Sequence, residues 1–460
     1  MSIYKKMLSE LKQKKIFYQA QNYAFEYIDN LETSRVYPNE EDLAKLKVFK
    51  ETLSEKGKTA SDILSLLHSK GSLGTVKHTG GRYFGFIIGG VTPISIATKW
   101  LTDLWDQCGG LYVSSPINSE LEVLCEKWLI ELLGLPKESI AGFVSGGSMA
   151  NFSAITAARY HILQNLGWNV NKKGLNGSPK IRIITHEQIH ASIRKNLILL
   201  GFGDENIEYL PSDNQGRIIV NSIPKLDDSC LVFLQAGNAN SGAFDDFDTV
   251  CKMANKVNAW VHIDGAFGLW VAASKELSYL TKGIEKADSW ALDAHKTLNT
   301  PYDSGIVICK HPDAMANALQ ATGEYIIYTS KKRDPMLYTP EMSKRSRVIE
   351  LWATLKYLGV QGVDEMITTF HVRAKQIEQG LRELGFQILN EVVFNQVLVA
   401  CDNEAKTKKT LDYIQKSGEC WLGGSTWHGK TVIRISISSW MTTESDIEKT
   451  INIFETAKNN

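Results

Sequence analysis

Apolar residues recur at helical spacing through the first part of the chain. In the segments 8–15, 24–31 and 41–53 they stand three or four positions apart, so each segment would present one apolar face as a helix. No strand pattern accompanies these segments to give them a sheet to cover. The pattern therefore predicts an N-terminal helical segment over residues 1–75, whose apolar faces need another surface to pack on.

Beyond residue 76 short apolar runs alternate with longer helical stretches. The apolar runs stand at 181–186, 230–237, 259–266 and 305–310. Strands joined by crossover helices produce this alternation, and they form a mostly parallel, doubly wound sheet. We therefore expect a large α/β domain over residues 76–335, with its site at the carboxyl ends of the strands.

A polar stretch at 328–340, which has the composition of a mobile loop, precedes a smaller region of mixed pattern. Two helical patterns follow it, at 347–359 and 365–385. Apolar runs and helices then alternate to the end of the chain, at 386–390, 396–402, 407–417 and 432–439, with a last helix opened by Thr442 and Thr443. This alternation predicts a small C-terminal α/β domain over residues 336–460.

Composition narrows the class of protein. The 460 residues include 51 Lys and Arg against 51 Asp and Glu, and this balance gives no reason to expect nucleic acid or a membrane surface as a partner. The charged N-terminal sequence has no secretory pattern, and no stretch approaches the roughly 18 apolar residues of a membrane span. Seven scattered cysteines without metal-ligand spacing favour reduced thiols in the cytoplasm and no metal site.

One apolar run ends in Ser145-Gly146-Gly147-Ser148, and a helical pattern follows it directly. Free backbone amides at the start of a helix, with glycines that permit close approach, form an anion site. The same residues also fit an ordinary glycine turn with Ser148 as the N-cap of the helix. By itself, this segment leaves both interpretations open.

Two further apolar runs end in residues that can carry chemistry. Asp264 stands at the end of one run, where a carboxylate is costly to bury unless it is paired. Lys296 follows another, beside His295, and partial burial there would make its amine a better nucleophile. Taken alone, Asp264 could cap a turn and Lys296 could be a solvated loop lysine.

Together, the three segments meet the requirements of pyridoxal 5'-phosphate. The phosphate of this cofactor needs a cradle of amides, its aldehyde needs a lysine, and its ring nitrogen needs an acid that keeps it protonated. An ion pair at about 4 Å and an effective dielectric constant near 20 contributes roughly 4 kcal/mol before desolvation. The sequence therefore predicts an enzyme that forms a Schiff base through Lys296, with Asp264 as the partner of the ring nitrogen.

The motifs of the chain resemble those of the group II pyridoxal-phosphate decarboxylases, the family of aromatic amino acid, histidine and glutamate decarboxylases. The resemblance runs from about residue 76 to 445, through SPINSELE, SGGSMAN, HEQIHASIRK, HIDGAFG, DAHK and RISISSW. It implies the fold type I architecture, pyridoxal 5'-phosphate as the cofactor, and decarboxylation of an L-amino acid to an amine and carbon dioxide.

The resemblance also implies roles for residues around the cofactor. Gly147, Ser148 and His295 would contact the phosphate. His190 would stack on the cofactor ring as a catalytic residue, and Ala266 would pack against the ring.

The resemblance places the substrate between two segments. Residues 78–86 resemble a pocket wall, so Tyr83 and Phe84 would contact the substrate, and RISISSW contributes Arg434. The aromatic residues of such a wall favour a bulky or aromatic substrate, whereas Arg82 would favour an acidic one. The further aromatic candidates are His78, Phe86 and Trp105.

Two segments depart from the family pattern. Where the family often has Asn-Pro-His-Lys-Trp, this chain has Asp293-Ala294-His295-Lys296-Thr297. A carboxylate at position 293 would repel a phosphate, so a phosphate contact from this residue is not expected. The family's GTTT stretch is replaced by Gly237-Asn238-Ala239-Asn240, and the roles of the two asparagines stay open.

The family protonates its substrate carbon with a tyrosine on a mobile loop. Tyr325 in QATGEYIIYTSKK is the best match, with Tyr328 and Tyr338 as rivals, and each could instead pack between the lobes. The family also implies a homodimer in which the N-terminal segment packs on the partner.

Other classes of function remain as alternatives. The same cofactor also supports transamination and retro-aldol cleavage, depending on which substrate bond stands perpendicular to its ring. A non-catalytic binding protein is a third alternative, but it would have no need of Lys296, Asp264 and His190 together.

Overall fold

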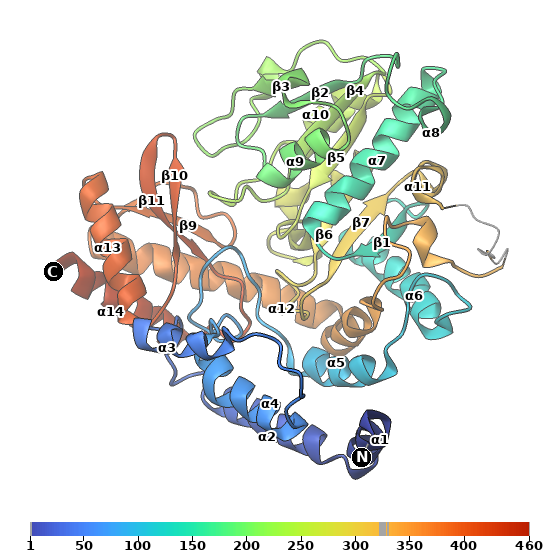
Figure 1. Ribbon diagram of the computed structural model, residues 1–460. Helices are drawn as coiled ribbons and strands as arrows, with labels where there is room; N and C mark the ends of the chain where they lie inside the picture. The colour runs from blue at the N-terminus through green and yellow to red at the C-terminus, as the bar shows by residue number, and fades with distance from the viewer. Residues whose placement is uncertain (1, 322–327, 329–330, 460) are drawn as a thin grey trace.

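The computed structural model describes residues 2–321, 328 and 331–459. Figure 1 shows how the helices and strands of these residues are arranged. The helices are α1 Ile3–Gln13, α2 Lys15–Asp29, α3 Glu40–Lys45, α4 Ala60–Leu66, α5 Pro93–Trp105, α6 Pro116–Leu133, α7 Gly147–Asn165, α8 Val170–Lys173, α9 Ala191–Leu199, α10 Phe247–Asn255, α11 Pro312–Leu319, α12 Val348–Glu383, α13 Glu404–Ser417 and α14 Glu444–Asn459. The strands are β1 Ile140–Val144, β2 Arg182–His186, β3 Ile207–Leu210, β4 Cys230–Gln235, β5 Trp260–Asp264, β6 Ser289–Asp293, β7 Gly305–Cys309, β8 Gln387–Ile388, β9 Gln396–Ala400, β10 Gly423–Trp427 and β11 Lys430–Ser436.

Seven strands form the large sheet, in the order β1-β7-β6-β5-β4-β2-β3. Strand β7 is antiparallel to both of its neighbours, and the other pairs are parallel. The expected mostly parallel sheet is confirmed. Because β7 runs opposite to the rest, its first residues lie at the same edge as the carboxyl ends of the parallel strands.

Helices cover both faces of the large sheet, which explains why its central strands are largely apolar and buried throughout. In β4, Leu231 and Phe233 pack in the hydrophobic core that α7 and α9 cover. Val232 and Leu234, which alternate with them, pack in the core that contains α6, α10 and α12. The doubly wound arrangement follows from this two-sided burial.

The C-terminal region forms a second sheet of four antiparallel strands, in the order β10-β11-β9-β8. Helix α12 reaches it from the large sheet and contains both predicted helices, 347–359 and 365–385. The predicted break between them is at Gly359, whose φ of 61° and ψ of −176° are not helical. Glycine adopts this conformation without the steric cost that a side chain would add.

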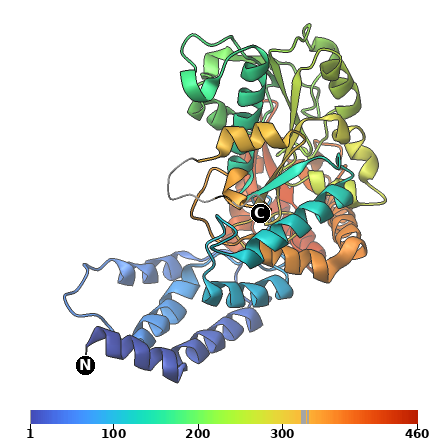
Figure 2. The same ribbon diagram turned by 90° about the vertical axis from the view of Figure 1, so that its right-hand side faces the viewer.

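The N-terminal helices project from the body of the molecule (Figure 2). Helix α2 packs on α4, but neither α1 nor α2 has a buried residue. The third predicted helix, 41–53, is shorter than expected, because α3 ends at Lys45 and a 3₁₀ turn ends at Phe49. The predicted domain boundaries after residues 75 and 335 stay predictions.

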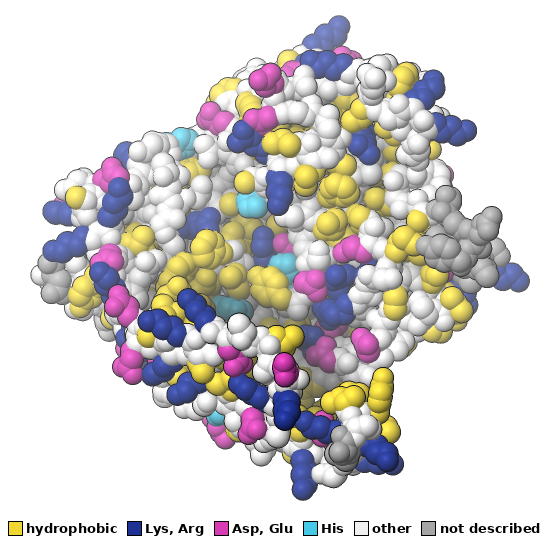
Figure 3. All heavy atoms as spheres, in the orientation of Figure 1, with side chains coloured by type: hydrophobic (Ala, Val, Ile, Leu, Met, Phe, Trp, Pro, Cys, Tyr) yellow, Lys and Arg dark blue, Asp and Glu magenta, His cyan; other side chains and the backbone are white. Residues whose placement is uncertain are grey.

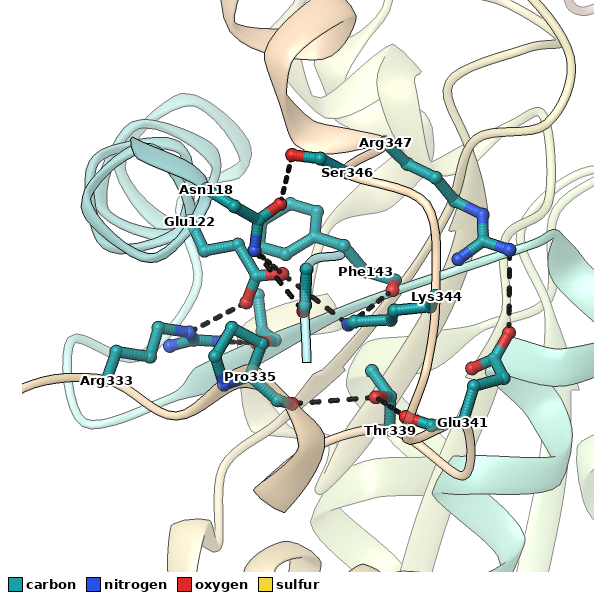
Figure 4. Close-up of polar contacts among 12 residues, drawn as sticks. Asn118, Glu122, Phe143, Arg333, Pro335, Thr339, Glu341, Lys344, Ser346 and Arg347 are labelled. Atoms are coloured by element: carbon teal, nitrogen blue, oxygen red, sulfur yellow. Dashed lines mark hydrogen bonds and ion pairs between the residues drawn. The ribbon is translucent and has the colours of Figure 1, made fainter. Parts of the chain in front are cut away.

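A cluster of buried charges fastens the chain after residue 331 to α6 and β1 (Figure 4). Glu122 on α6 is 1% exposed; its carboxylate accepts from Arg333 at 2.9 Å and lies 3.5 Å from the Lys344 ammonium. Lys344 also donates to the carbonyl of Phe143 in β1 at 3.1 Å, and Arg333 pairs with Glu126 at 2.8 Å. Removal of any one member of such a cluster would leave an opposite charge buried without compensation.

Among the described residues, no helix is both long and apolar enough to cross a lipid bilayer.

Candidate active site

A cavity of about 390 Å³ lies at the carboxyl edge of the large sheet. Figure 3 shows this face of the molecule hollowed between the two lobes, with histidine side chains inside the hollow. The cavity brings together six of the predicted residues, namely Gly147, Ser148, His190, Ala266, His295 and Lys296. Five residues for which the sequence predicted no role in the site also line it: Met149, Asn151, Ser192, Asp293 and Tyr302.

The start of helix α7 gives the cavity its anion cradle. Gly146 is the N-cap residue and offers no side chain to the first turn. The amides of Met149 and Ala150 donate to the Gly146 carbonyl, while those of Gly147 and Ser148 have no acceptor within the described part of the chain. Ser148 is therefore not the N-cap, and the alternative of an ordinary capped turn is wrong. Open amides at the positive end of a long helix favour a bound anion.

The glycines of this cradle are required by close packing from behind. A side chain at Gly147 would put its Cβ 2.9 Å from Asp293 Oδ2. A side chain at Gly305 in β7 would put its Cβ 2.3 Å from the Gly146 backbone. Atoms cannot approach so closely, so any larger residue would displace the cradle.

Asp264 ends strand β5 as a buried carboxylate that accepts two hydrogen bonds. It is 4% exposed. Asn151 Nδ2 donates to its Oδ2 at 3.2 Å, and the Ala266 amide donates to its Oδ1 at 3.2 Å. Donors aimed at a carboxylate stabilise its ionised form.

A chain of hydrogen bonds fixes the orientation of Asn151. The Trp260 indole, which can only donate, donates to Ser289 Oγ at 3.0 Å, so the serine hydroxyl proton is free for His262 Nδ1 at 2.9 Å. His262 Nε2 then carries its proton toward Asn151 Oδ1 at 2.9 Å, which turns the amide nitrogen toward Asp264. Burial lowers the pKa of His262 to about 4. The neutral imidazole therefore persists at physiological pH and keeps the chain in this order.

Lys296 follows strand β6 and points toward Asp293 at the end of that strand. Lys296 Nζ lies 3.3 Å from Asp293 Oδ2, and His295 Nε2 lies 3.7 Å from the same oxygen. The Ser304 amide donates to His295 Nδ1 at 3.1 Å, so the proton of a neutral His295 is on Nε2, facing Asp293. Burial lowers the pKa of His295, although Asp293 opposes this effect.

His190 stands at the N-cap of α9, after strand β2. Its Nδ1 accepts from the Ser192 amide at 3.2 Å and lies 2.8 Å from Ser192 Oγ, so the ring is held in one orientation. Loss of hydration lowers the pKa of His190, and Lys296 and Arg434 lower it further, while Asp264 raises it. A neutral imidazole on the cavity wall is suited to stack on an aromatic ring.

The residues predicted to contact substrate lie outside the wall of this cavity. Tyr83 stacks on Trp421 with ring centroids 5.1 Å apart, and Phe84 is 1% exposed in the hydrophobic core. Arg434 donates to the Ala239 carbonyl at 3.0 Å. Trp105 lies at the end of α5 and is 48% exposed.

The two asparagines whose roles were open make structural contacts. Asn238 Oδ1 accepts from the amides of Asn240 and Ser241, at 2.9 and 3.2 Å, and so closes the turn after β4. Asn240 Oδ1 accepts from Ser425 in β10 at 2.7 Å and joins the two lobes.

The predicted proton donor, Tyr325, lies outside the described residues. Of its rivals, Tyr328 donates to the Ala321 carbonyl at 2.6 Å. Tyr338 packs beneath the Arg333 guanidinium, 4.7 Å from its ring centroid. Neither rival lines the cavity, whereas Tyr302 does. The role of Tyr325 stays a prediction.

Arg82 is bound in structural ion pairs. The side chain is 7% exposed and donates to Glu419 Oε2 at 3.0 Å and to the Glu32 carbonyl at 2.7 Å. Its Nε lies 3.6 Å from Asp446 Oδ1. Arg82 therefore ties the N-terminal segment to the small lobe, and it does not line the cavity.

The missed residues stand close to the motifs that carried the prediction. Asn151 is four positions after Gly147, and His262 is two positions before Asp264. Helical spacing alone places Asn151 on the same side of α7 as Gly147, one turn further along. Ser192 and Tyr302 gave no comparable signal, because their positions depend on how separate elements pack.

These residues fit pyridoxal 5'-phosphate in all three of its requirements. The open amides suit its phosphate, Lys296 suits its aldehyde, and Asp264 suits its ring nitrogen. Such a combination at the carboxyl edge of a doubly wound sheet defines the class of fold type I pyridoxal-phosphate enzymes.

The chain belongs to the pyridoxal-dependent decarboxylase family, since the conserved domain of that family matches residues 44–400. It is 26% identical to the aromatic-L-amino-acid decarboxylase of Bacillus atrophaeus, over 96% of this chain and 94% of that protein. It is also 26% identical to the acidic amino acid decarboxylase of Mus musculus, over 70% of this chain and only 60% of that relative. The fold matches Oryza sativa TDC, solved with PLP and tryptamine, at a TM-score of 0.90 and 19% identity, over 98% of both chains.

The protein is accordingly a carboxy-lyase that uses pyridoxal 5'-phosphate to decarboxylate an amino acid. When bound, the cofactor supplies a protonated ring that accepts the electron pair left behind by the departing carboxylate. Asp264 would hold the ring nitrogen of the cofactor, and the Asn151–His262 chain keeps the Asp264 carboxylate oriented. Lys296 presents an amine, and His190 walls the cavity with a neutral ring.

Proposed function

We propose that the enzyme decarboxylates an L-amino acid with an aromatic side chain, and that Lys296 is the residue that carries the cofactor. A row of aromatic rings that leads away from the cavity supports the choice of substrate. Tyr302 on the cavity wall packs on His295 with centroids 4.2 Å apart and meets His78 edge-on at 6.5 Å. His78 in turn meets Tyr83 at 6.0 Å, and Tyr83 stacks on Trp421.

The far end of this aromatic row is held in an unusual backbone conformation. Phe86 lies 5.4 Å from Trp421, is 61% exposed and has a φ of 53°, and Ile87 follows with a φ of 56°. Bulky and β-branched residues rarely adopt positive φ, which costs of order 1–3 kcal/mol. An exposed phenyl ring kept at that cost is consistent with a contact surface for a flat apolar group.

The charges near the row agree with an aromatic rather than an acidic substrate. Arg82, the one arginine of segment 78–86, is committed to Glu419 and Asp446. Burial lowers the pKa of His78, which disfavours a positive charge there. Burial also raises the pKa of Tyr83 to about 12, so this phenol stays neutral. An acidic side chain would therefore find no cation along the row.

A substrate panel tests the proposal. The purified enzyme with added pyridoxal 5'-phosphate would be assayed for carbon dioxide and amine from phenylalanine, tyrosine and tryptophan, and from aspartate, glutamate and cysteine sulfinate. We expect kcat/KM for at least one aromatic amino acid to exceed every acidic value by tenfold or more, about 1.4 kcal/mol of discrimination. Higher values for an acidic amino acid would overturn the choice of substrate, and keto acid without carbon dioxide would indicate transamination.

Borohydride trapping tests the role of Lys296. Reduction of the loaded wild-type enzyme should attach the cofactor to the peptide that contains Lys296, and Lys296→Ala should abolish the adduct. Lys332→Ala is the matched control, because Lys332 is an exposed lysine paired with Glu120. A cofactor adduct on any other lysine would contradict the assignment.

We also propose that the enzyme acts as a homodimer in the cytoplasm. Helices α1 and α2 contain no fully buried residue within the chain, and their exposed apolar side chains support a second copy as their partner. All seven cysteines are unpaired, which is consistent with a reducing compartment.

A further inference from the structure

Asp293 is a buried carboxylate at the place where the cofactor's phosphate is expected. It ends strand β6 and is 2% exposed. Its Oδ2 lies 2.9 Å from where a Cβ on Gly147 would be, and its Oδ1 lies 3.7 Å from the same point on Gly146. The carboxylate therefore stands directly behind the anion cradle at the start of α7, and it adds negative charge to a site built for an anion.

Only one oxygen of the Asp293 carboxylate faces polar partners. Lys296 Nζ and His295 Nε2 face Oδ2, at 3.3 and 3.7 Å. Oδ1 is buried and has no hydrogen-bond partner among the described residues. A buried carboxylate oxygen without a donor is costly.

The ionisable groups around Asp293 offer little compensation for a second anion. Lys296 is the cation that faces it, and this amine must lose a proton before it can attack an aldehyde. Burial favours the neutral form of His295 by lowering its pKa. Tyr302 from the β7 side and His190 from α9 are the remaining titratable groups that sense Asp293: burial and Asp293 raise the pKa of Tyr302, and burial lowers that of His190.

We propose that Asp293 sets how tightly this site holds the cofactor's phosphate. Its negative charge opposes the phosphate, and phosphate binding is accompanied by uptake of a proton at the Asp293–His295 pair. A phosphate monoester carries about −1.5 to −2 charges near neutral pH. With Asp293 ionised and His295 neutral, the cradle amides and the Lys296 side chain would have to offset both anions. A proton taken up by the Asp293–His295 pair removes one of these charges.

This inference rests on the family's cofactor and goes beyond the proposed function, since it concerns the affinity and pH dependence of binding. Pyridoxine 5'-phosphate is the probe, because it carries the phosphate but has no aldehyde for Lys296. Pyridoxine, which lacks the phosphate, is the reference ligand. Calorimetric titration near pH 8 in two buffers of different ionisation enthalpy gives both Kd and the number of protons taken up. At about this pH the phosphate of the probe is already a dianion, so its own titration adds little.

The variants separate charge from shape. Asp293→Asn keeps the shape and removes the charge, and Asp293→Ser is a second neutral variant in case the first does not fold. Asp288→Asn is the matched control. Asp288 directly precedes the opposite end of β6 and pairs with His311 at 2.8 Å, away from the cavity.

We expect Asp293→Asn to bind pyridoxine 5'-phosphate about tenfold or more tightly than wild type, and to take up fewer protons on binding. The Kd of the wild type should rise with pH, by up to about tenfold per unit for one coupled proton, and this slope should be shallower in the variant. Asp288→Asn should match the wild type, and the affinity for pyridoxine should not change.

Equal Kd and equal proton uptake in wild type and Asp293→Asn would overturn the inference while leaving the cofactor site intact. If pyridoxine 5'-phosphate bound no better than pyridoxine in the wild type, both the inference and the phosphate site would be wrong.

Discussion

Asn151 controls the acid of the site without being an acid itself. It donates to Asp264 only because His262 holds its oxygen on the other side. This chain joins five side chains through four hydrogen bonds, and its two ends are the donor-only indole of Trp260 and the acceptor-only carboxylate of Asp264. This chain of hydrogen bonds therefore sets the orientation of the Asp264 carboxylate. It should also make the site sensitive to substitutions of residues that do not touch the substrate.

Asn151→Leu should lower kcat strongly, because it removes one of the two donors to Asp264 and leaves the His262 Nε2 proton without an acceptor. Loss of a hydrogen bond to a charged group costs about 1.5–3 kcal/mol, which corresponds to a tenfold to hundredfold loss of rate if the cost falls on the charged ring.

Asp264→Asn should have at least as large an effect, since it removes the charge itself. Both variants would be assayed with cofactor content measured by absorbance. Thr156→Val, a buried change on the same helix that breaks only a bond to the Phe152 carbonyl, should retain wild-type turnover. A wild-type rate for Asp264→Asn would exclude its pairing with the ring nitrogen.

The buried His262 should also make the protein sensitive to acid. Its pKa is lowered to about 4 in the folded protein by burial, whereas an unfolded histidine titrates near 6.5. The unfolded state therefore binds a proton first as pH falls, so this contribution to stability is present above pH ~6.5 and is lost down to pH ~4, up to about 3 kcal/mol in total. Urea unfolding between these pH values should show a shallower pH slope for His262→Gln than for wild type. The exposed His428→Gln serves as the control, and an unchanged slope in His262→Gln would contradict the assignment.

The site residues that the sequence predicted all lie in local motifs. Gly147, Asp264 and Lys296 each end or follow an apolar run, so their neighbours in sequence indicate where they stand. The bond between Asn151 and Asp264 joins residues 113 positions apart, and that between His262 and Ser289 joins residues 27 apart. Such pairs depend on the sheet order and on the angle of α7 across it, which no local pattern encodes.

At the scale of elements, the anion cradle depends on three neighbours in the sheet. Strand β1 delivers α7, strand β6 delivers Asp293 and Lys296, and the antiparallel β7 lies between them. Gly305 at the start of β7 touches the Gly146 backbone, so the reversed strand supports the loop from behind. The apolar runs predicted strands, but the reversal of β7 follows from its pairing and was not visible in the sequence.

Helix α6 offers a comparison of two neighbouring ion pairs. Glu122 is buried between Arg333 and Lys344, whereas Glu120 pairs with Lys332 at the surface, where both side chains are about half exposed. Glu122→Gln would leave two buried cations short of an anion, and burial already lowers the pKa of Lys344. We expect a loss of about 3–5 kcal/mol in the free energy of unfolding.

Glu120→Gln is the control for this prediction, and it should cost less than about 1 kcal/mol because water screens the exposed pair. Chemical denaturation at one fixed protein concentration would measure both variants. Equal effects of the two substitutions would show that burial does not strengthen the Glu122 cluster.

At the scale of the whole molecule, the two sheets and the N-terminal helices differ in how their apolar surface is covered. The central strands β4, β5, β6 and β7 are buried on both faces within the chain, and their apolar runs were sufficient to predict this. The N-terminal helices have the opposite property. Their pattern predicted helices with apolar faces, and much of those faces is exposed in the single chain.

Helix α1 has an apolar face that no other part of the described chain buries. Its apolar stripe is exposed, with Ile3 at 60%, Leu8 at 57% and Leu11 at 59%. An isolated helix of eleven residues is marginal in water, and helices in proteins depend on burial of one face. A second copy of the chain would supply that burial for α1 and α2 together. Obligate dimers of this kind often bury more than about 2,000 Å².

The double variant Leu8→Glu, Leu11→Glu should therefore shift the protein from dimer to monomer, because two charges would have to be buried in an apolar interface. Sedimentation velocity would distinguish a 51.4 kDa chain from twice that mass. Ser9→Glu with Gln13→Glu adds the same two charges to the opposite side of α1, where the two side chains bond to each other, and it should remain dimeric. Loss of activity that follows dissociation in the first variant, and its recovery at high protein concentration, would tie catalysis to the dimer. A wild-type protein that sediments as a monomer at nanomolar concentration and remains fully active would exclude an obligate dimer.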